Sequence, residues 1–568
     1  MNVILLSGGS GKRLWPLSND VRSKQFIKLF RKPTSEAVSL STSSVNLTND
    51  GGIGNEADKN TAEESGRGPV NFPNILTIKG PDKKTVSGGE PTLMSTDKIA
   101  NNGSVICNEH SNFAGDRNTG DVPPEIASVN GIVETVGMAG TGKEAGTAET
   151  AAGVELESMV QRIYRQLRET DPDAVITIAT SRSQVSALHN QLGPQVDISV
   201  EPCRRDTFAA IALATAYLHD VKHVPSEEAV VVCPVDPYVD NEYFKTVQQM
   251  YEAAKSGKHR LTLMGITPTY PSEKYGYISQ SPTAPDGSVS DKTGAGTCGV
   301  TFTEKPSKEK AAEYIHRGAL WNGGVFAYKL SYVLDKSKEL LDTSDYSELL
   351  ASYAGLKKIS FDYAVVEKEP SIGVVRYSGT WKDLGTWNTL TEAMEESVLG
   401  SARLASSCKN VHVVNELGLP IIALGLSDVV ISASPEGILV SDKEQSSYIK
   451  PLVEELDSEV KFAEKSWGSY RVLDASDNSL TIKVTLNPSH RMNYHSHLHR
   501  DEVWTVIAGS GRTIVDGMEQ PVKTGDVITM AAGCKHTVVA GEQGLQLIEV
   551  QLGADISVSD KVKYADPF

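Results

Sequence analysis

Residues 2–26 read NVILLSGGSGKRLWPLSNDVRSKQF, an apolar run that passes directly into a glycine-rich stretch. The run Val3–Leu6 predicts a buried strand, and the glycines after it predict a loop whose backbone amides can come close to a phosphate. The glycines are Gly8, Gly9 and Gly11, and the basic residues are Lys12, Arg13 and Lys24. The stretch departs from the Walker pattern, which has Ser or Thr where Arg13 stands. We therefore predict a strand that opens into a phosphate loop, with a plain structural turn as the alternative.

The charge of the chain limits its partners. Its 568 residues include 72 acidic and 55 basic side chains, a formal net charge of −17. Nucleic acid and anionic membranes are poor partners for such a chain, so an anionic substrate requires a local basic pocket. The six cysteines form no CxxC pair, which is typical of a reducing compartment. Without a basic leader or an apolar run near the ~18 residues that span a bilayer, we expect a soluble, cytoplasmic protein.

Composition divides the chain into four parts. Residues 31–153 are rich in small and polar side chains and contain no Trp or Tyr, so they lack the apolar surface that would offset the entropy of ordering. We expect a mostly disordered insertion there, which a surface loop can tolerate. The predicted parts are one domain at 1–30 and 154–395, the insertion at 31–153, a small β element at 396–462, and a C-terminal domain at 463–568.

Residues 157–394 alternate between helical and strand-like periodicity. Helical patterns at 157–167 and 208–217 alternate with strand-like runs at 174–179, 196–200 and 229–233. Ser181 is placed to cap a further helix. The alternation predicts an α/β domain with a mostly parallel sheet, in which ligands bind at the carboxyl ends of strands.

Two carboxylates fit that rule. Asp236 directly follows an apolar run at 230–235, and Asp383 comes after the apolar residues 373–375. Together they could hold Mg²⁺, which takes oxygen ligands from one or two carboxylates and from substrate phosphates. Taken singly, each could equally be the aspartate of a turn or helix cap.

The string GGSGKRLWPLS with KQF behind it resembles the signature of sugar-phosphate nucleotidyltransferases, and its LWPLS part resembles the mannose-1-phosphate guanylyltransferase branch. Further strings match that family in order: VEP and RDT at 200–207, PVDPYV at 234–239, YGYI at 275–278, EKP at 304–306, WNGGVF at 321–326, FDYA at 361–364 and WKDLGTW at 381–387. The resemblance implies a Rossmann-like domain that makes GDP-mannose and pyrophosphate from GTP and mannose-1-phosphate, for polysaccharide biosynthesis. A non-catalytic sugar-nucleotide sensor is the alternative.

The resemblance also implies roles for individual residues. The catalytic set would be Arg13, Lys24, Asp236 and Asp383, with Mg²⁺ on the two aspartates. The nucleotide would be bound by Gly8, Gly9, Gly11, Lys12, Arg13 and Glu201. The sugar would be bound by Gly276, Glu304, Lys305 and Asn322, although Gly276 and Asn322 could instead be turn residues.

Residues 411–440 consist of short apolar runs separated by turn residues, which predicts a small β element. It resembles the short β-helical segment that follows the transferase domain in the same family. We expect it to serve packing or contacts within a homo-oligomer and to carry no chemistry.

The C-terminal hundred residues contain a metal-ligand pattern. His495, His497 and His499 alternate, which predicts that they share one face of a strand, and Glu502, Gly509 and His536 follow. This spacing is that of a cupin, a β jelly roll. The predicted ligands of a divalent transition metal such as Zn²⁺ are His495, His497, Glu502 and His536. A metal-free cupin with the histidines as a polar wall is the alternative.

The region from Ser466 onward resembles the cupin domain of type II mannose-6-phosphate isomerases that are fused to guanylyltransferases. Two positions depart from that family: His495 stands where Gln is usual, and Lys563 lies where the family has an Arg-bearing motif. Arg and Lys are not interchangeable at a fixed anion contact. A bifunctional enzyme that also interconverts mannose-6-phosphate and fructose-6-phosphate is therefore one hypothesis, and metal binding without isomerisation is the other.

Overall fold

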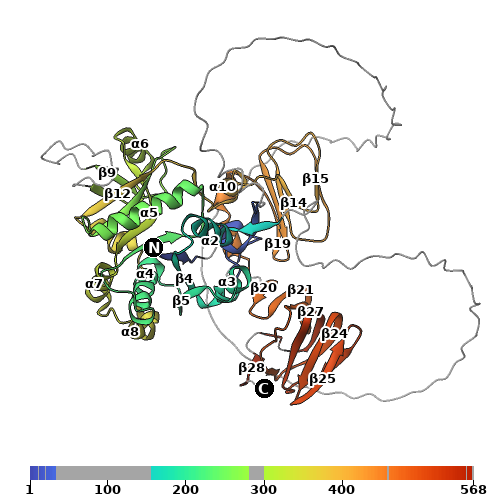
Figure 1. Cartoon of the computed structure of the whole chain (residues 1–568). Helices are drawn as coiled ribbons and strands as arrows, with labels where there is room; N and C mark the ends of the chain where they lie inside the picture. The colour runs from blue at the N-terminus through green and yellow to red at the C-terminus, as the bar shows by residue number, and fades with distance from the viewer. Residues whose placement is uncertain are drawn as a thin grey trace, which may run out of the picture. The chain divides into compact units, whose positions relative to one another are not determined.

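A computed structural model describes residues 1–9, 12–19, 21–33, 155–280, 300–456, 460–554, 556–557 and 560–565. The predicted insertion at 31–153 lies outside the described residues except for its first three positions, and Gly11 lies outside them as well. Figure 1 shows the described elements with the labels used below.

The α/β domain is built on one large sheet. Its strands are β1 (Asn2–Ser7), β4 (Val175–Ser181), β5 (Asp197–Glu201), β6 (Ala229–Pro234), β8 (Leu261–Ile266), β9 (Tyr277–Gln280), β10 (Val300–Thr303), β11 (Leu320–Lys329) and β12 (Ile372–Tyr377). Their order is β10-β9-β11-β6-β1-β4-β5, and β8 pairs with both β11 and β12.

This sheet is mixed, which corrects the expectation of a mostly parallel one. Strands β5, β4, β1 and β6 are parallel neighbours, as is the pair β8 and β12. Strand β11, however, runs antiparallel to β6, β8 and β9. An apolar run that is covered on both faces has the same appearance in either direction, so periodicity could not distinguish the two.

Helices cover both faces of the sheet (Figure 1). Successive residues of β1 alternate between the two faces: Val3 and Leu5 pack with α2 (Met159–Thr170) and α5 (Asn241–Ser256), whereas Ile4 packs with α4 (Asp206–Ala216) and α7 (Leu330–Leu341). The helices are α2 (Met159–Thr170), α3 (Val185–Leu192), α4 (Asp206–Ala216), α5 (Asn241–Ser256), α6 (Lys308–His316), α7 (Leu330–Leu341), α8 (Tyr346–Ser352), α9 (Phe361–Ala364) and α10 (Trp387–Thr391). Helix α2 begins with a capping box in which Ser158 and Gln161 satisfy each other's backbone amides.

The two ends of the predicted insertion meet in a short ladder. Strand β2 (Lys28–Arg31) pairs antiparallel with β3 (Leu156–Ser158), and the Lys32 amide donates to the Glu155 carbonyl at 2.9 Å. The α/β domain is therefore continuous across this point through backbone hydrogen bonds.

The predicted small β element is present, and its strands pair in parallel except for Val429–Ser434 with Gly437–Asp442, which are antiparallel. It contains β14 (Val398–Gly400), β15 (Ala402–Leu404), β16 (His412–Asn415), β17 (Ile421–Ala423), β18 (Val429–Ser434), β19 (Gly437–Asp442) and the short helix α11 (Lys450–Glu454). Strands β14, β16 and β18 stack in parallel, and so do β15 and β17, which is the pairing of a β-helical segment.

The C-terminal region forms the predicted jelly roll. Its strands are β20 (Phe462–Lys465), β21 (Gly468–Ser476), β22 (Ser479–Leu486), β23 (His495–His497), β24 (Arg500–Val515), β25 (Met518–Lys523), β26 (Val527–Met530), β27 (His536–Gly553) and β28 (Lys561–Lys563). The long strands β24 and β27 pair with register shifts that bend them. Gly509 lies at one shift with φ +79°, where a Cβ would be 2.3 Å from the Gly544 carbonyl oxygen, so only glycine fits.

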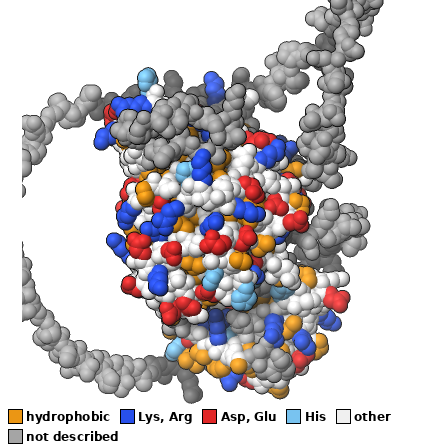
Figure 2. All heavy atoms as spheres, turned by 60° about the vertical axis from the view of Figure 1, so that its left-hand side comes forward, with side chains coloured by type: hydrophobic (Ala, Val, Ile, Leu, Met, Phe, Trp, Pro, Cys, Tyr) orange, Lys and Arg blue, Asp and Glu red, His pale blue; other side chains and the backbone are white. Residues whose placement is uncertain are grey.

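On the face shown in Figure 2, acidic and basic side chains are interspersed and do not gather by sign. Among the described helices, none is long and apolar enough to cross a membrane.

Candidate functional site

The two predicted metal carboxylates lie side by side. Asp236 lies two residues after the end of β6, in agreement with the rule for the carboxyl ends of parallel strands. Asp383 reaches it differently: it ends β13 (Trp381–Asp383), which pairs antiparallel with β7 (Pro237–Val239), so that Asp383 lies opposite Pro237. The sheet strand that precedes it, β12, ends at Tyr377, well before Asp383. A separate two-stranded ribbon, which the sequence pattern did not reveal, therefore brings the carboxylates together.

Lys24 lies between the two carboxylates. Its Nζ is 2.9 Å from an Asp236 oxygen and 3.8 Å from an Asp383 oxygen, and its side chain is only 15% exposed. Burial alone would lower the pKa of Lys24, but the two aspartates outweigh burial and the pKa is raised. Lys24 in turn holds the pKa of Asp236 below its usual range despite desolvation. Burial, helped by the Asp236 charge, raises the pKa of Asp383.

The glycine loop opens directly above β1. Gly9 has φ +105°, a conformation that favours glycine, and its carbonyl accepts a hydrogen bond of 2.9 Å from the Ser23 hydroxyl. Among the described residues, no heavy atom beyond the chain neighbours lies within 4 Å of a Cβ built on Gly8 or Gly9, so these residues leave that side of the loop open. Lys12 and Arg13 follow in a single turn, η1 (Lys12–Leu14), and the Arg13 charge acts on both Lys24 and Asp383. These predicted phosphate contacts thus border the carboxylate pair.

The four predicted sugar residues also lie together. The Asn322 amide donates to the Gly276 carbonyl at 2.8 Å, and a Cβ on Gly276 would be 2.5 Å from a Glu304 carboxylate oxygen. Lys305 forms an ion pair with Glu304. A Cβ at position 276 would also be 2.6 Å from the Phe302 ring, so a larger residue there would displace the side chains around it.

Asp362 joins this group, although only its motif and not its role was recognised in the sequence. The Asn322 side-chain amide donates to its carboxylate at 2.7 Å. Burial, together with the nearby Glu304 charge, raises the pKa of Asp362 to about 6. Its position after a loop far along the chain gave no signal of this contact.

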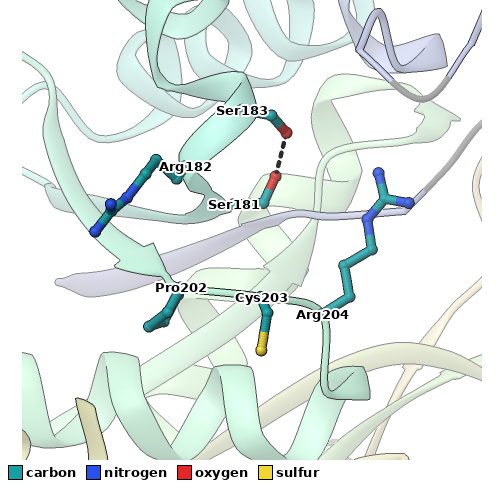
Figure 3. A pocket seen from close by; sticks show the side chains of 6 residues that line it. All are labelled: Ser181, Arg182, Ser183, Pro202, Cys203 and Arg204. Atoms are coloured by element: carbon teal, nitrogen blue, oxygen red, sulfur yellow. Dashed lines mark hydrogen bonds between the residues drawn. The ribbon is translucent and has the colours of Figure 1, made fainter. Parts of the chain in front are cut away.

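A shallow cavity lies between the carboxyl ends of β4 and β5. Its volume is about 510 Å³, and it is lined by Ser181, Arg182, Ser183, Pro202, Cys203 and Arg204 (Figure 3). Ser181 does not cap α3 as predicted, because the turn η3 (Arg182–Gln184) precedes that helix; its hydroxyl lies 3.1 Å from that of Ser183, as Figure 3 shows.

Glu201 ends β5 beside this cavity. Its carboxylate is buried and accepts a 2.7 Å hydrogen bond from the Tyr353 hydroxyl, and burial raises the pKa of Glu201. One of its two oxygens is therefore held by the protein itself.

The C-terminal region contains a second cluster of ligand groups. His495, His497, Glu502 and His536 are all buried, and one ligand atom from each lies within 4.8 Å of all the others. His497 Nε2 is 3.0 Å and His536 Nε2 is 3.2 Å from the Glu502 carboxylate. Arg500 Nε is a further 3.5 Å contact of this carboxylate, and among the described residues both buried Glu502 oxygens lack a hydrogen bond of good geometry, as is expected of groups that face a metal position.

Backbone carbonyls orient two of these rings. His495 Nδ1 lies 2.6 Å from the Asn493 carbonyl and His536 Nδ1 lies 3.0 Å from the Cys534 carbonyl, so each Nδ1–H donates and each Nε2 is left to bind a metal. His499 does not share their face as predicted. Strand β23 ends at His497, and the His499 ring is 61% exposed and paired with Asp560.

Comparison with known proteins identifies this architecture. The family model for nucleotidyl transferases matches residues 2–77 and 151–398, and the model for the mannose-6-phosphate isomerase C-terminal region matches residues 454–566. The chain belongs to the nucleotidyl transferase family, and its C-terminal region is similar to the C-terminal region of mannose-6-phosphate isomerase.

Several relatives share most of its length. A mannose-1-phosphate guanylyltransferase of Salmonella montevideo is 25% identical, with 72% of this chain and 92% of that protein aligned. The xanthan biosynthesis protein XanB of Xanthomonas campestris is 27% identical over the same shares. The structure of a mannose-1-phosphate geranyltransferase from Thermus thermophilus has the same fold, with a TM-score of 0.50, 22% identity, and coverage of 80% of this chain and 99% of that one.

Proposed function

We propose that this protein is a mannose-1-phosphate guanylyltransferase, which forms GDP-mannose and pyrophosphate from GTP and mannose-1-phosphate. The observation that carries the proposal is the meeting of Lys24, Asp236 and Asp383 beside an open glycine loop. The names of the relatives support the choice of substrates. The division of labour would follow the parts predicted from sequence, with 1–30 and 154–395 for transfer and 463–568 for metal binding.

The carboxylate pair fits Mg²⁺. Asp236 and Asp383 offer hard oxygen ligands, and more than a third of each side chain is exposed, so substrate phosphates can complete the coordination. The bound ion would neutralise charge on the nucleotide and sugar phosphates.

The reaction asks the chain mainly for positioning. An oxygen of mannose-1-phosphate attacks the α-phosphorus of GTP, the bond to the β-phosphate breaks, and pyrophosphate leaves with that electron pair. The attacking phosphate is already ionised, so no general base is needed. The amides of Gly8 and Gly9 with the Arg13 guanidinium would hold the β- and γ-phosphates, and the Lys24 ammonium would stabilise negative charge at the α-phosphorus.

The sugar would lie on the face that carries Gly276, Glu304 and Asn322. The Glu304 carboxylate and the Asn322 amide supply an acceptor and a donor for hydroxyl groups, and Asp362 holds the Asn322 side chain in place. Three aromatic rings adjoin this face: Tyr275, Trp321 and Trp381 lie with ring centroids 4.9 to 6.1 Å apart.

One assay tests the proposal. Purified protein is incubated with Mg²⁺, mannose-1-phosphate and each of the four nucleoside triphosphates in turn, and pyrophosphate release is measured. We expect release with GTP that depends on both the sugar phosphate and Mg²⁺. Equal release without sugar phosphate, or a clear preference for another nucleotide, would contradict it.

The C-terminal cluster supports a second, separable property. We propose that His495, His497, Glu502 and His536 bind one divalent transition ion, Zn²⁺ among the candidates. Backbone carbonyls orient the His495 and His536 rings through Nδ1, and the buried Glu502 carboxylate lies 3.0 and 3.2 Å from Nε2 of His497 and His536. Metal analysis of the dialysed protein tests this property independently of transfer.

A further inference from the structure

Arg22 joins residues 8–24, the segment that contains the glycine loop and Lys24 and is called the catalytic loop below, to the β element. Its Nη1 and Nη2 donate to the two carboxylate oxygens of Glu416 at 2.7 and 2.8 Å, a bidentate pair. The two side chains are only 17% and 23% exposed, and the Phe462 ring covers the guanidinium, with its centroid 5.4 Å from Cζ. Such a pair is strong and fixes orientation as well as distance.

Glu416 is itself held by the β element. It follows β16 directly, and its amide donates to the Ala433 carbonyl of β18 at 2.8 Å. The carboxylate that binds Arg22 therefore projects from a hydrogen-bonded ladder and not from a free loop.

The same element touches the loop at two more points. The Ser434 hydroxyl donates to the Pro16 carbonyl at 2.7 Å and is buried. Gly437 lies against the Trp15 ring, where a Cβ would be 2.5 Å from Cζ2, so a larger residue there would displace the ring. The β element thus contacts the loop both before and after its turn at Asn19.

Few bonds separate these contacts from Lys24. The Arg22 amide donates to the Asn19 side chain at 2.6 Å, which fixes the turn, and the Ser23 hydroxyl ties the next residue to Gly9 at 2.9 Å. Lys24 follows at once and reaches Asp236 at 2.9 Å. A displacement of Arg22 would therefore be passed to the Lys24 ammonium.

We propose that Arg22 and Glu416 are positioning residues of the transfer reaction, through which the β element holds Lys24 against the metal carboxylates. The inference rests on the proposed function. It gives the β element, for which packing or oligomer contacts were expected, a role in support of the active site. Geometry at a reacting centre is demanding, since a misplacement of about 1 Å can cost about 10²-fold in rate.

The test compares Arg22→Gln, Glu416→Gln and the double variant. Each single change leaves one buried group without its partner and should lower the unfolding temperature, whereas the double change removes both charges and should restore much of it. We expect kcat to fall about tenfold in all three, with the double variant no worse than either single one, because the link is lost in each. If kcat recovers in the double variant along with stability, the pair has a structural role only.

Glu396→Gln is the matched control. Glu396 pairs with Arg31, which also connects the N-terminal segment to the start of the β element but lies beyond Lys24. This variant should keep wild-type kcat, and an equal loss of kcat there would contradict a specific role for Arg22.

A second readout does not need turnover. Trace acetylation followed by mass spectrometry reports the accessibility of Lys24, with the exposed Lys28 as internal standard. Labelling of Lys24 should rise about tenfold in the Arg22 and Glu416 variants, as expected when a link worth about 1.4 kcal/mol is lost. If labelling of Lys24 is unchanged in the variants, the inference is overturned, whichever reaction the wild type catalyses. If labelling rises but the wild type shows no transferase turnover, only the proposed function is contradicted.

Discussion

Replacing Asp236 with Asn removes one charge from the centre of the proposed site at almost constant volume. In the wild type, Lys24 is 2.9 Å from Asp236 and 3.8 Å from Asp383. With an effective dielectric constant of about 20, these separations correspond to about 6 and about 4 kcal/mol of attraction, upper values because the carboxylates are partly exposed. Asp383 therefore still compensates the Lys24 charge after the substitution, and we expect the variant to fold.

Catalysis should respond far more strongly than stability. The variant loses one of two proposed Mg²⁺ ligands and the nearest partner of Lys24. Loss of a single group that stabilises transition-state charge typically costs about 10²–10³-fold. With both effects acting together we expect a fall in kcat/KM of about 10³-fold, or ~4 kcal/mol. Asp383→Asn should behave alike.

The assay is pyrophosphate release from GTP and mannose-1-phosphate across a Mg²⁺ titration. Thermal unfolding of the same samples checks the fold, and Asp173→Asn, at an exposed position outside the site, is the matched control. Turnover within about tenfold of wild type at low Mg²⁺ in either site variant would refute the assignment of these aspartates as metal ligands.

Three other outcomes are expected. The pKa of Asp362 is raised from 3.8 to about 6, so the folded state favours the protonated carboxyl over the ionised one. The protonated form therefore contributes stability that is fully present below pH 3.8 and is lost as the pH rises through 6. Asp362→Asn should accordingly raise the free energy of unfolding at neutral pH by up to about 3 kcal/mol and leave it unchanged in acid. The same variant should have a higher KM for the sugar phosphate. A loss of stability at neutral pH, measured by chemical denaturation, would contradict this prediction. Replacing residues 34–153 with a short Gly/Ser turn should change kcat/KM less than about tenfold, because Lys32 and Glu155 already meet; a larger loss in a folded protein would give the insertion a part in the site. Metal analysis of the dialysed full-length protein should find one equivalent of a divalent transition ion, and the Glu502→Gln variant should have lost it. Isomerase turnover should be weak in a coupled assay. Robust activity that His497→Ala abolishes would show that Lys563 can replace the Arg motif.

The sequence by itself determined the local chemistry of the site. The apolar run Val3–Leu6 and the glycines after it predicted a strand and an open loop, because burial and positive φ leave signatures in neighbouring residues. The α/β class and the small β element were predicted from their patterns of apolar residues, and the jelly roll was predicted from the spacing of its His, Glu and Gly residues. The predicted metal ligands of that region followed from the spacing of His495, His497, Glu502 and His536.

Only the tertiary structure decided which of these parts meet. The direction of β11 relative to β6 depends on a pairing between segments far apart in the chain. The same is true of the separate ribbon that brings Asp383 to Asp236. His499 shows the limit within a single motif, because β23 ends before it and Asp560 draws its ring away.

The contact between Arg22 and Glu416 joins residues that are 394 positions apart in the chain, and it belongs to no recognised motif. The sequence around Arg22 and Glu416 does not distinguish them from ordinary solvent-exposed charged residues. They are brought together by the core in which Leu14 and Leu17 pack with Val414 and Val430. Hydrophobic burial is not directional and is set by every element that packs together, so a local pattern can predict that a residue is buried but not against what.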